Sequence, residues 1–138
     1  MPENKIVKFT DLEAWRVAHQ FRIAILKLTA TFPPEHRFGL SSQMQRAAIS
    51  IGSNIAEGFG RQGKQEKIQF YRIARGSLTE VQDQLIVARD INLLKSDKFL
   101  RLGEQSARAH QLLNGLIRSV RTRTTKSELQ IPKTELHE

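Results

Sequence analysis

Residues 40–61 read LSSQMQRAAISIGSNIAEGFGR, and this stretch decides the fold class. At 100° per residue its apolar side chains recur on one face, which is typical of an amphipathic helix. The apolar positions are Leu40, Met44, Ala47, Ala48, Ile51 and Ile55. We expect this helix to end near Gly58 and Gly60, because glycine adopts a left-handed helix terminus at little cost.

A polar stripe runs beside the apolar face within an arc of about 80°. It consists of Gln43, Arg46, Ser50, Asn54, Glu57 and Arg61. Because residues i and i+4 touch on a helix, Glu57 can pair with Arg61, or with Arg46 across a neighbour. Three interpretations remain open: a hydrogen-bond network between subunits, a ligand or nucleic-acid site, and a solvated face. A buried network would need every charge paired, since an unpaired buried charge is costly.

Three further segments carry the helical period. The first helix is expected from Asp11 to about Ala30, with Thr10 and Glu13 forming a capping box, and Pro33 and Pro34 break the chain after it. The next is expected from Lys64 to about Ile91, with a core stripe of Ile68, Tyr71, Ala74, Leu78, Val81 and Leu85. The last is expected from an N-cap at Ser96 to Arg123, with a buried stripe of Phe99, Leu102, Ala109, Leu113, Leu116, Ile117 and Val120.

Four amphipathic helices with short connections predict an all-α protein, an up-down-up-down antiparallel four-helix bundle. We assign the bundle to residues 10–123. Residues 1–9 are expected to form a flexible arm. Residues 124–138 contain few apolar side chains and a proline, so we expect a disordered tail there.

The helix expected over residues 64–91 has a second, partly apolar side. Gly76 lies almost opposite the core stripe, and Ile73 and Val87 share its side with Glu80 between them. A glycine inside a helix costs about 1 kcal/mol relative to alanine, so its presence needs a reason. We interpret Gly76 and Glu80 as part of a face that packs against another subunit. A tolerated glycine on a solvated face is the alternative.

The composition favours a protein with an acidic partner. The 138 residues carry a formal net charge of +8 and include no cysteine, which excludes disulfides, cysteine–zinc sites and thiol catalysis. Nucleic acid is the commonest partner of so basic a chain, although the charge can also serve solubility alone. The polar N-terminus and the absence of a long apolar run predict a cytoplasmic protein with no membrane segment.

No constellation predicts catalysis or a cofactor. Ser50 has Arg46 and Asn54 one turn away, and neither can act as a base at neutral pH. The histidines are scattered, so we expect no metal site. Residues 58–63 match GxGxxG but follow a helix instead of a strand, which excludes a dinucleotide site. We expect a protein that is not an enzyme.

Basic residues gather towards the end of the last helix. The candidate nucleic-acid contacts are Arg101, Arg108, Arg118, Arg121, Arg123 and Lys126. Cations also suit the C-terminal end of a helix dipole, but that explains one or two of them. Because aromatic side chains for base stacking are nearly absent from this segment, we expect salt-dependent phosphate contacts with little sequence specificity.

The pattern QxxRAxxSIxSNIAEGxGR at residues 43–61, followed by IARGSLTEVQDQL at residues 73–85, resembles the family of four-helix-bundle proteins encoded in 23S rRNA intervening sequences. It also resembles the related accessory proteins of diversity-generating retroelements. The resemblance extends from about Phe9 to Ile117. It implies a homopentameric ring of bundles and a role beside RNA, and it brings a reverse transcriptase into consideration as a partner.

Two functional hypotheses follow. The first is a non-enzymatic oligomeric scaffold that contacts structured RNA or DNA through its basic surface. The second is a protein-binding adaptor, whose basic surface meets an acidic protein and which has no nucleic-acid role.

Overall fold

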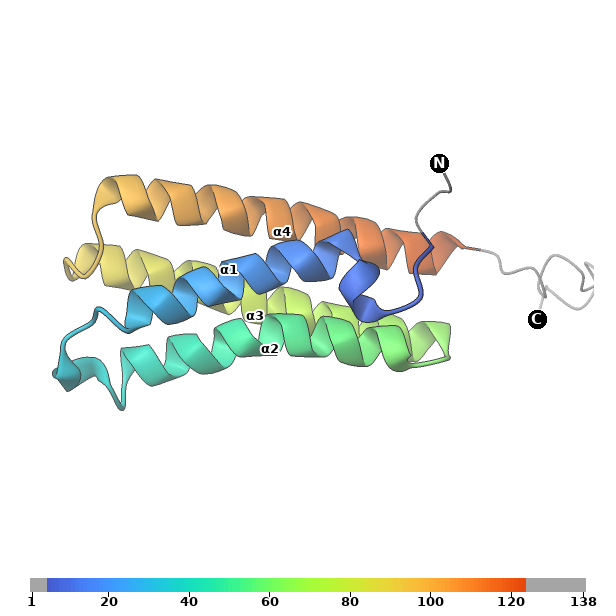
Figure 1. Ribbon diagram of the computed structural model, residues 1–138, viewed down its shortest axis with the longest axis horizontal. Coiled ribbons are helices and arrows are strands. Elements are labelled where there is room, and N and C mark those ends of the chain that lie inside the picture. The colour runs from blue at the N-terminus through green and yellow to red at the C-terminus, as the bar shows by residue number, and fades with distance from the viewer. Residues whose placement is uncertain (1–4, 124–138) are drawn as a thin grey trace, which may run out of the picture.

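The computed structural model describes residues 5–123 and shows four long helices that run antiparallel in chain order (Figure 1). They are α1 (Glu13–Thr29), α2 (Leu40–Gly60), α3 (Lys64–Asp90) and α4 (Ser96–Thr122). Each helix packs against its neighbours in the chain, and α1 packs against α4 to close the bundle. The predicted all-α four-helix bundle is confirmed. The tail expected at residues 124–138, with Lys126, and the first four residues of the expected arm lie outside the described residues.

The predicted apolar faces form the core of the bundle. Met44, Ile51 and Ile55 of α2 are at most 1% exposed, and every residue of the predicted α3 stripe is buried. Burying a large apolar side chain stabilises the fold by about 1.5–3 kcal/mol, so these stripes drive the association of the helices. Leu40, Phe99 and Leu116 are partly buried and pack against the edge of the core.

The start of α1 differs from the prediction. A short 3₁₀ turn, η1 (Phe9–Asp11), precedes the helix, which begins at Glu13 with Leu12 as its N-cap and without a side-chain cap. The predicted capping box at Thr10 is therefore wrong. The Asp11 carboxylate instead accepts hydrogen bonds from the backbone amides of Val7 and Lys8, both at 2.9 Å. An ionised carboxylate is the stronger acceptor, and it stabilises the turn before the helix.

Two other helix ends also differ. Ser96 is the first residue of α4, and Lys95 is the N-cap, so the predicted serine cap is wrong. No described glycine has a positive φ, so α2 does not end in a left-handed glycine; Arg61 leaves it with extended backbone. The left-handed residue follows α3 instead, at Asn92 with φ 66°. Asparagine tolerates this conformation better than most residues.

A 3₁₀ turn, η2 (Pro34–His36), lies in the connection from α1 to α2. Pro33 is the N-cap of this turn, and α1 ends at Thr29, before the two prolines. Between residues 5 and 123 no helix is both long enough and apolar enough to cross a membrane.

Candidate nucleic-acid interface

The candidate interface lies where α3 and α4 pack side by side. Arg75 Nη1 donates a hydrogen bond to Asn114 Oδ1 at 2.8 Å, and Gln82 Nε2 donates one to Ser106 Oγ at 3.1 Å. These two contacts set the antiparallel register of the pair. The first half of α3 therefore lies along the second half of α4. These halves lie at the end of the bundle where α1 begins and α4 ends (Figure 1).

This register brings together cations from two separate parts of the chain. The sequences 64–79 and 108–122 contain several lysines and arginines, and Glu66 is their one carboxylate residue. On α3, Lys64 and Arg75 fall on the side that faces α4, with Arg72 within the same arc of about 80°. We call the following set the cationic face: Lys64, Arg72, Arg75, Arg118, Arg121 and Arg123. All are exposed except Arg75, which its bond to Asn114 holds half-buried.

The positive charge of Arg123 lowers the pKa of two residues of α3, Lys67 and Tyr71. Burial lowers the pKa of the Lys67 ammonium, and the positive charge of Arg123 lowers it further. Burial also raises the pKa of Tyr71 to about 12, an effect that Arg123 opposes. Lys67 Nζ donates to the carbonyl of Phe59 at 2.7 Å, so this ammonium caps the end of α2. Arg123 has no such partner among the described residues and remains exposed.

The six predicted basic residues do not form one site. Arg118, Arg121 and Arg123 lie together on the cationic face, whereas Lys126 is outside the described residues. Arg108 Nη2 forms a salt bridge with Glu13 Oε2 of α1 at 3.0 Å, so the charge of Arg108 is already paired. Arg101 precedes Arg118 by 17 residues, about 26 Å along the helix, and lies 3.8 Å from Asp97 Oδ2.

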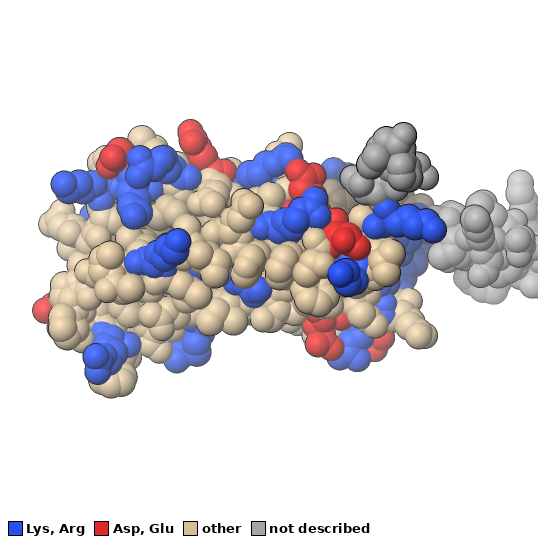
Figure 2. Space-filling model, viewed as in Figure 1, with Lys and Arg blue, Asp and Glu red and all other residues tan. Residues whose placement is uncertain are grey.

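On the side of the bundle that carries α1, α2 and the near flank of α4, Figure 2 shows lysines and arginines dispersed among uncharged surface and acidic side chains. In this orientation α3 lies behind the other helices (Figure 1). The dispersed cations of this side offer no continuous basic track.

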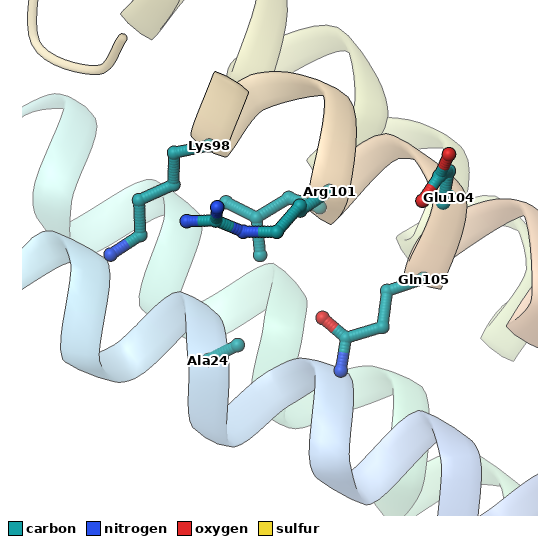
Figure 3. Close-up of a pocket in the computed structure, with 6 residues that line it drawn as sticks. Ala24, Lys98, Arg101, Glu104 and Gln105 are labelled. Carbon is teal, nitrogen blue, oxygen red and sulfur yellow. The ribbon is translucent and has the colours of Figure 1, made fainter. Parts of the chain in front are cut away.

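A hollow of about 540 Å³ lies between α1 and α4 around Arg101. Lys98, Arg101 and Gln105 of α4 extend towards α1 above Ala24, while Glu104 points away (Figure 3). The hollow is wide open to solvent and its lining includes both signs of charge. It is therefore a weaker candidate for an anion site than the cationic face.

The residues of the α2 polar stripe form several separate hydrogen-bonded groups and not one continuous network. Ser50 Oγ shares a 2.9 Å hydrogen bond with Ser77 Oγ of α3, and Asn54 Nδ2 donates to both Ser50 oxygens. Of the two partners open to Glu57, the structure selects Arg61, at 2.7 Å. Arg46 Nη1 instead donates to Ser42 Oγ at 2.7 Å. Gln43 is exposed at the start of the stripe.

The outer side of α3 presents apolar surface beside this stripe. Ile73 and Val87 are 44% and 41% exposed, and a Cβ added to Gly76 would meet no atom within 4 Å. Glu80 Oε2 accepts from Gln84 Nε2 at 3.3 Å, yet the buried Gln84 Oε1 has no hydrogen-bond partner among the described residues. An unpaired buried amide oxygen is costly, which makes the surroundings of Gln84 an unusual part of this side.

Sequence reasoning missed Lys64, Arg72 and Arg75. Their signal was present, because residues 64–79 carry four basic residues and one acidic residue. In an up-down-up-down bundle, the start of the third helix lies beside the end of the fourth. Combining charge with topology would have found the α3 contribution. Among residues 5–123 no three histidine, aspartate or glutamate side chains are grouped in a way that could hold a metal ion.

Comparison with known proteins agrees with this architecture. A protein of unknown function from the S23 ribosomal protein family of Bacteroides thetaiotaomicron VPI-5482 has a similar crystal structure, with a TM-score of 0.71 and 23% sequence identity. The match covers 76% of this chain and 95% of that one. At this identity the likeness concerns the fold. No curated protein matches the chain.

The pattern of residues along α1 to α4 identifies the family. The model of the 23S rRNA-intervening sequence proteins matches residues 10–115, which covers most of the bundle and includes the α2 polar stripe. The chain therefore belongs to the 23S rRNA-intervening sequence protein family.

Proposed function

We propose that this protein binds the phosphate backbone of structured RNA or duplex DNA through the cationic face and carries out no reaction. The observation behind the proposal is that α3 and α4 place their basic halves side by side with Glu66 as the one carboxylate residue in those halves. Neutralising phosphates releases counterions, which supplies most of the affinity of such contacts. The family name, which refers to an rRNA insertion, is consistent with an RNA partner.

The aromatic side chains near the cationic face favour phosphate contact over base readout. Tyr71 is buried, and the ring of Phe70 is covered by the Arg61 guanidinium at 4.8 Å. Phe99, further along α4, lies under Arg89 at 4.5 Å. Single-strand binding usually depends on rings on which bases can stack. We therefore expect duplexes and structured RNA to bind at least as well as single strands, with little dependence on sequence.

A salt series tests the proposal directly. The protein should shift a structured RNA or a duplex DNA at low salt, and the affinity should fall steeply towards physiological salt. Replacing Arg118, Arg121 and Arg123 by glutamine should weaken binding to all sequences alike. It should also lower the slope of log affinity against log salt by about 3, one for each phosphate that is no longer neutralised. Electrophoretic mobility shift or fluorescence anisotropy measures both quantities.

The matched control removes the same charge from the other end of the bundle. Changing Lys95, Lys98 and Arg101 to glutamine lowers the net charge by the same amount at exposed positions. This variant should keep most of the affinity and of the salt slope. Equal losses in both triple variants would mean that net charge alone drives binding. If the parent binds no nucleic acid at low salt, the proposal fails and the protein-binding adaptor becomes the better hypothesis.

We also propose that copies of the chain associate through the outer side of α2 and α3. Support comes from the exposed Ile73 and Val87, the open notch at Gly76 and the unpaired buried oxygen of Gln84. The family resemblance implies five copies in a ring. Several cationic faces in one assembly would bind a long nucleic acid with higher avidity than a single face, provided that the geometry lets them engage together.

A further inference from the structure

A groove between α1 and α4 runs along the part of α4 that lies away from the cationic face. Two adjoining hollows of about 540 and 270 Å³ form it, and Lys98 and Arg101 line both of them. The first hollow extends along α4 to Gln105, and the second extends to Leu93 in the connection after α3. We call these two hollows the α1–α4 groove. From Lys95 to Gln105 it follows α4 for about 15 Å, the length of nearly three helical turns.

The floor of the α1–α4 groove is apolar. Ala24 of α1 and Leu102 of α4 line the first hollow, and Leu28 and Leu94 line the second. The three leucines are buried and Ala24 is half-buried, so these side chains form a firm base and not a mobile surface. A partner that lays apolar side chains on this floor removes more apolar surface from water, which favours binding.

Cations border the groove on both helices. Lys98 and Arg101 extend from α4 towards α1 (Figure 3). Lys27 lies within about 60° of Ala24 around α1, and therefore on the same side of that helix. Lys27, Lys95 and Lys98 are exposed, and none of them forms a salt bridge within residues 5–123. The border of the groove can therefore attract the carboxylates of a partner.

The other groups in the groove favour a protein segment over a nucleic acid. Asp97 lies 3.8 Å from Arg101, and Glu104 stands beside the first hollow although it points away from it (Figure 3). These carboxylates repel a continuous row of phosphates, whereas a protein segment can place its own carboxylates opposite single cations. None of the residues that line the two hollows is aromatic, so they provide no ring for base stacking. A second copy of this chain is disfavoured, because each copy has a net charge of +8.

We propose that the α1–α4 groove binds an acidic amphipathic helix of another protein. The apolar face of that helix lies on the floor of the groove, in the way that amphipathic helices occupy hydrophobic grooves of other proteins. Lys95, Lys98 and Arg101 follow one another at intervals of three residues, so carboxylates one turn apart on the partner helix can reach them. This site uses none of the residues of the cationic face and does not depend on nucleic-acid binding.

A model peptide tests the groove. It consists of about four helical turns of leucine, alanine and glutamate, with leucine on one face and glutamate along both edges of that face. Its addition to the isotope-labelled protein should shift the amide signals of residues 20–31 and 93–105. The same peptide with glutamine in place of every glutamate keeps the apolar face. It should bind about tenfold more weakly at low salt, because its attraction to the cations is lost.

A pair of double variants tests the role of the groove cations. Lys98→Gln with Arg101→Gln should weaken binding of the acidic peptide about three- to tenfold, since one exposed ion pair contributes up to about fivefold in affinity. Arg118→Gln with Arg121→Gln removes the same charge from the cationic face and should change the affinity by less than about twofold. Fluorescence anisotropy of the labelled peptide measures these affinities.

A second pair of variants tests the floor without removing a cation. Ala24→Glu places a carboxylate next to Lys98 and Arg101, where it competes with the carboxylates of the peptide and should weaken binding. Ala107→Glu adds the same charge at an exposed position of α4 and should have a smaller effect. Circular dichroism shows whether each variant keeps the helix content of the parent.

Four results would overturn the proposal. The parent could fail to bind the acidic peptide at low salt, or bind the glutamine peptide equally well. The shifted amides could concentrate in residues 64–79 and 108–122, which would mean that the peptide is attracted by the cationic face alone. Finally, a structured RNA could shift the groove amides more strongly than the peptide does, which would assign the groove to the nucleic-acid surface.

Discussion

Gly58 of α2 lies against the ring of Tyr71, and its missing side chain is what allows the two helices to approach. A Cβ at this position would come within 2.7 Å of Tyr71 Cε1 and 3.0 Å of Phe70 Cβ. The tyrosine ring is 2% exposed and has little room to move. We expect Gly58→Ala to lower the free energy of unfolding by about 1–2 kcal/mol, because overpacking outweighs the gain in helix propensity. Urea denaturation measures the change.

Gly103 of α4 provides the control for the substitution of Gly58. It is also inside a helix, but an added Cβ would meet no atom within 4 Å. Gly103→Ala should therefore raise the free energy of unfolding by up to about 1 kcal/mol. Equal effects of the two substitutions would show that helix propensity, and not contact with Tyr71, determines the result at Gly58.

At the scale of the element, periodicity predicted all four helices and their buried faces, because a core stripe is a property of one segment. The helix ends were harder. Thr10 and Ser96 have the right side chains for caps, but Leu12 is the N-cap of α1 and Lys95 is the N-cap of α4, both without a side-chain cap. The cationic face was found only in its α4 half, since its α3 half depends on how two helices pair. Such pairing is not encoded in the local pattern of either helix.

The middle of α2 is tied to α3 by Ser50. Its hydroxyl bonds Ser77 Oγ and accepts from Asn54, all at 2.9 Å and half-buried. Ser50→Ala would leave two polar groups without this partner, so we expect a loss of about 1–2 kcal/mol in the free energy of unfolding. Ser53→Ala, one turn along α2 at an exposed position, should change stability by less than about 0.5 kcal/mol.

A double-mutant cycle with Ser77→Ala isolates the contact between the helices. The coupling between Ser50 and Ser77 should be favourable and at least about 0.5 kcal/mol, as is usual for residues in direct contact. Additive effects of the two substitutions would mean that the serines contribute independently and that the interhelical bond adds nothing.

On the scale of the whole molecule, the two proposed surfaces occupy different sides of the same helix. Most of the cationic face uses the side of α3 that turns towards α4, while Ile73, Gly76 and Val87 point away from the core on its outer side. Arg72 lies between the two surfaces, beside Ile73 in one surface hollow. Self-association through the outer side would therefore leave the cationic face open to a nucleic acid except near Arg72. This separation allows the two proposed functions to be tested one at a time.

The mass of the protein in solution tests the association surface. The parent should elute as an oligomer at micromolar concentration, with five copies as the number that the family resemblance implies. Replacing both Ile73 and Val87 by glutamate should shift the mass towards the monomer, because buried unpaired carboxylates would oppose contact between copies. Leu100→Glu, at a position 62% exposed on α4, should leave the mass unchanged. Light scattering coupled to size exclusion gives these masses. A monomeric parent would exclude the association, and a double variant of unchanged mass would exclude this side of α3 as its surface.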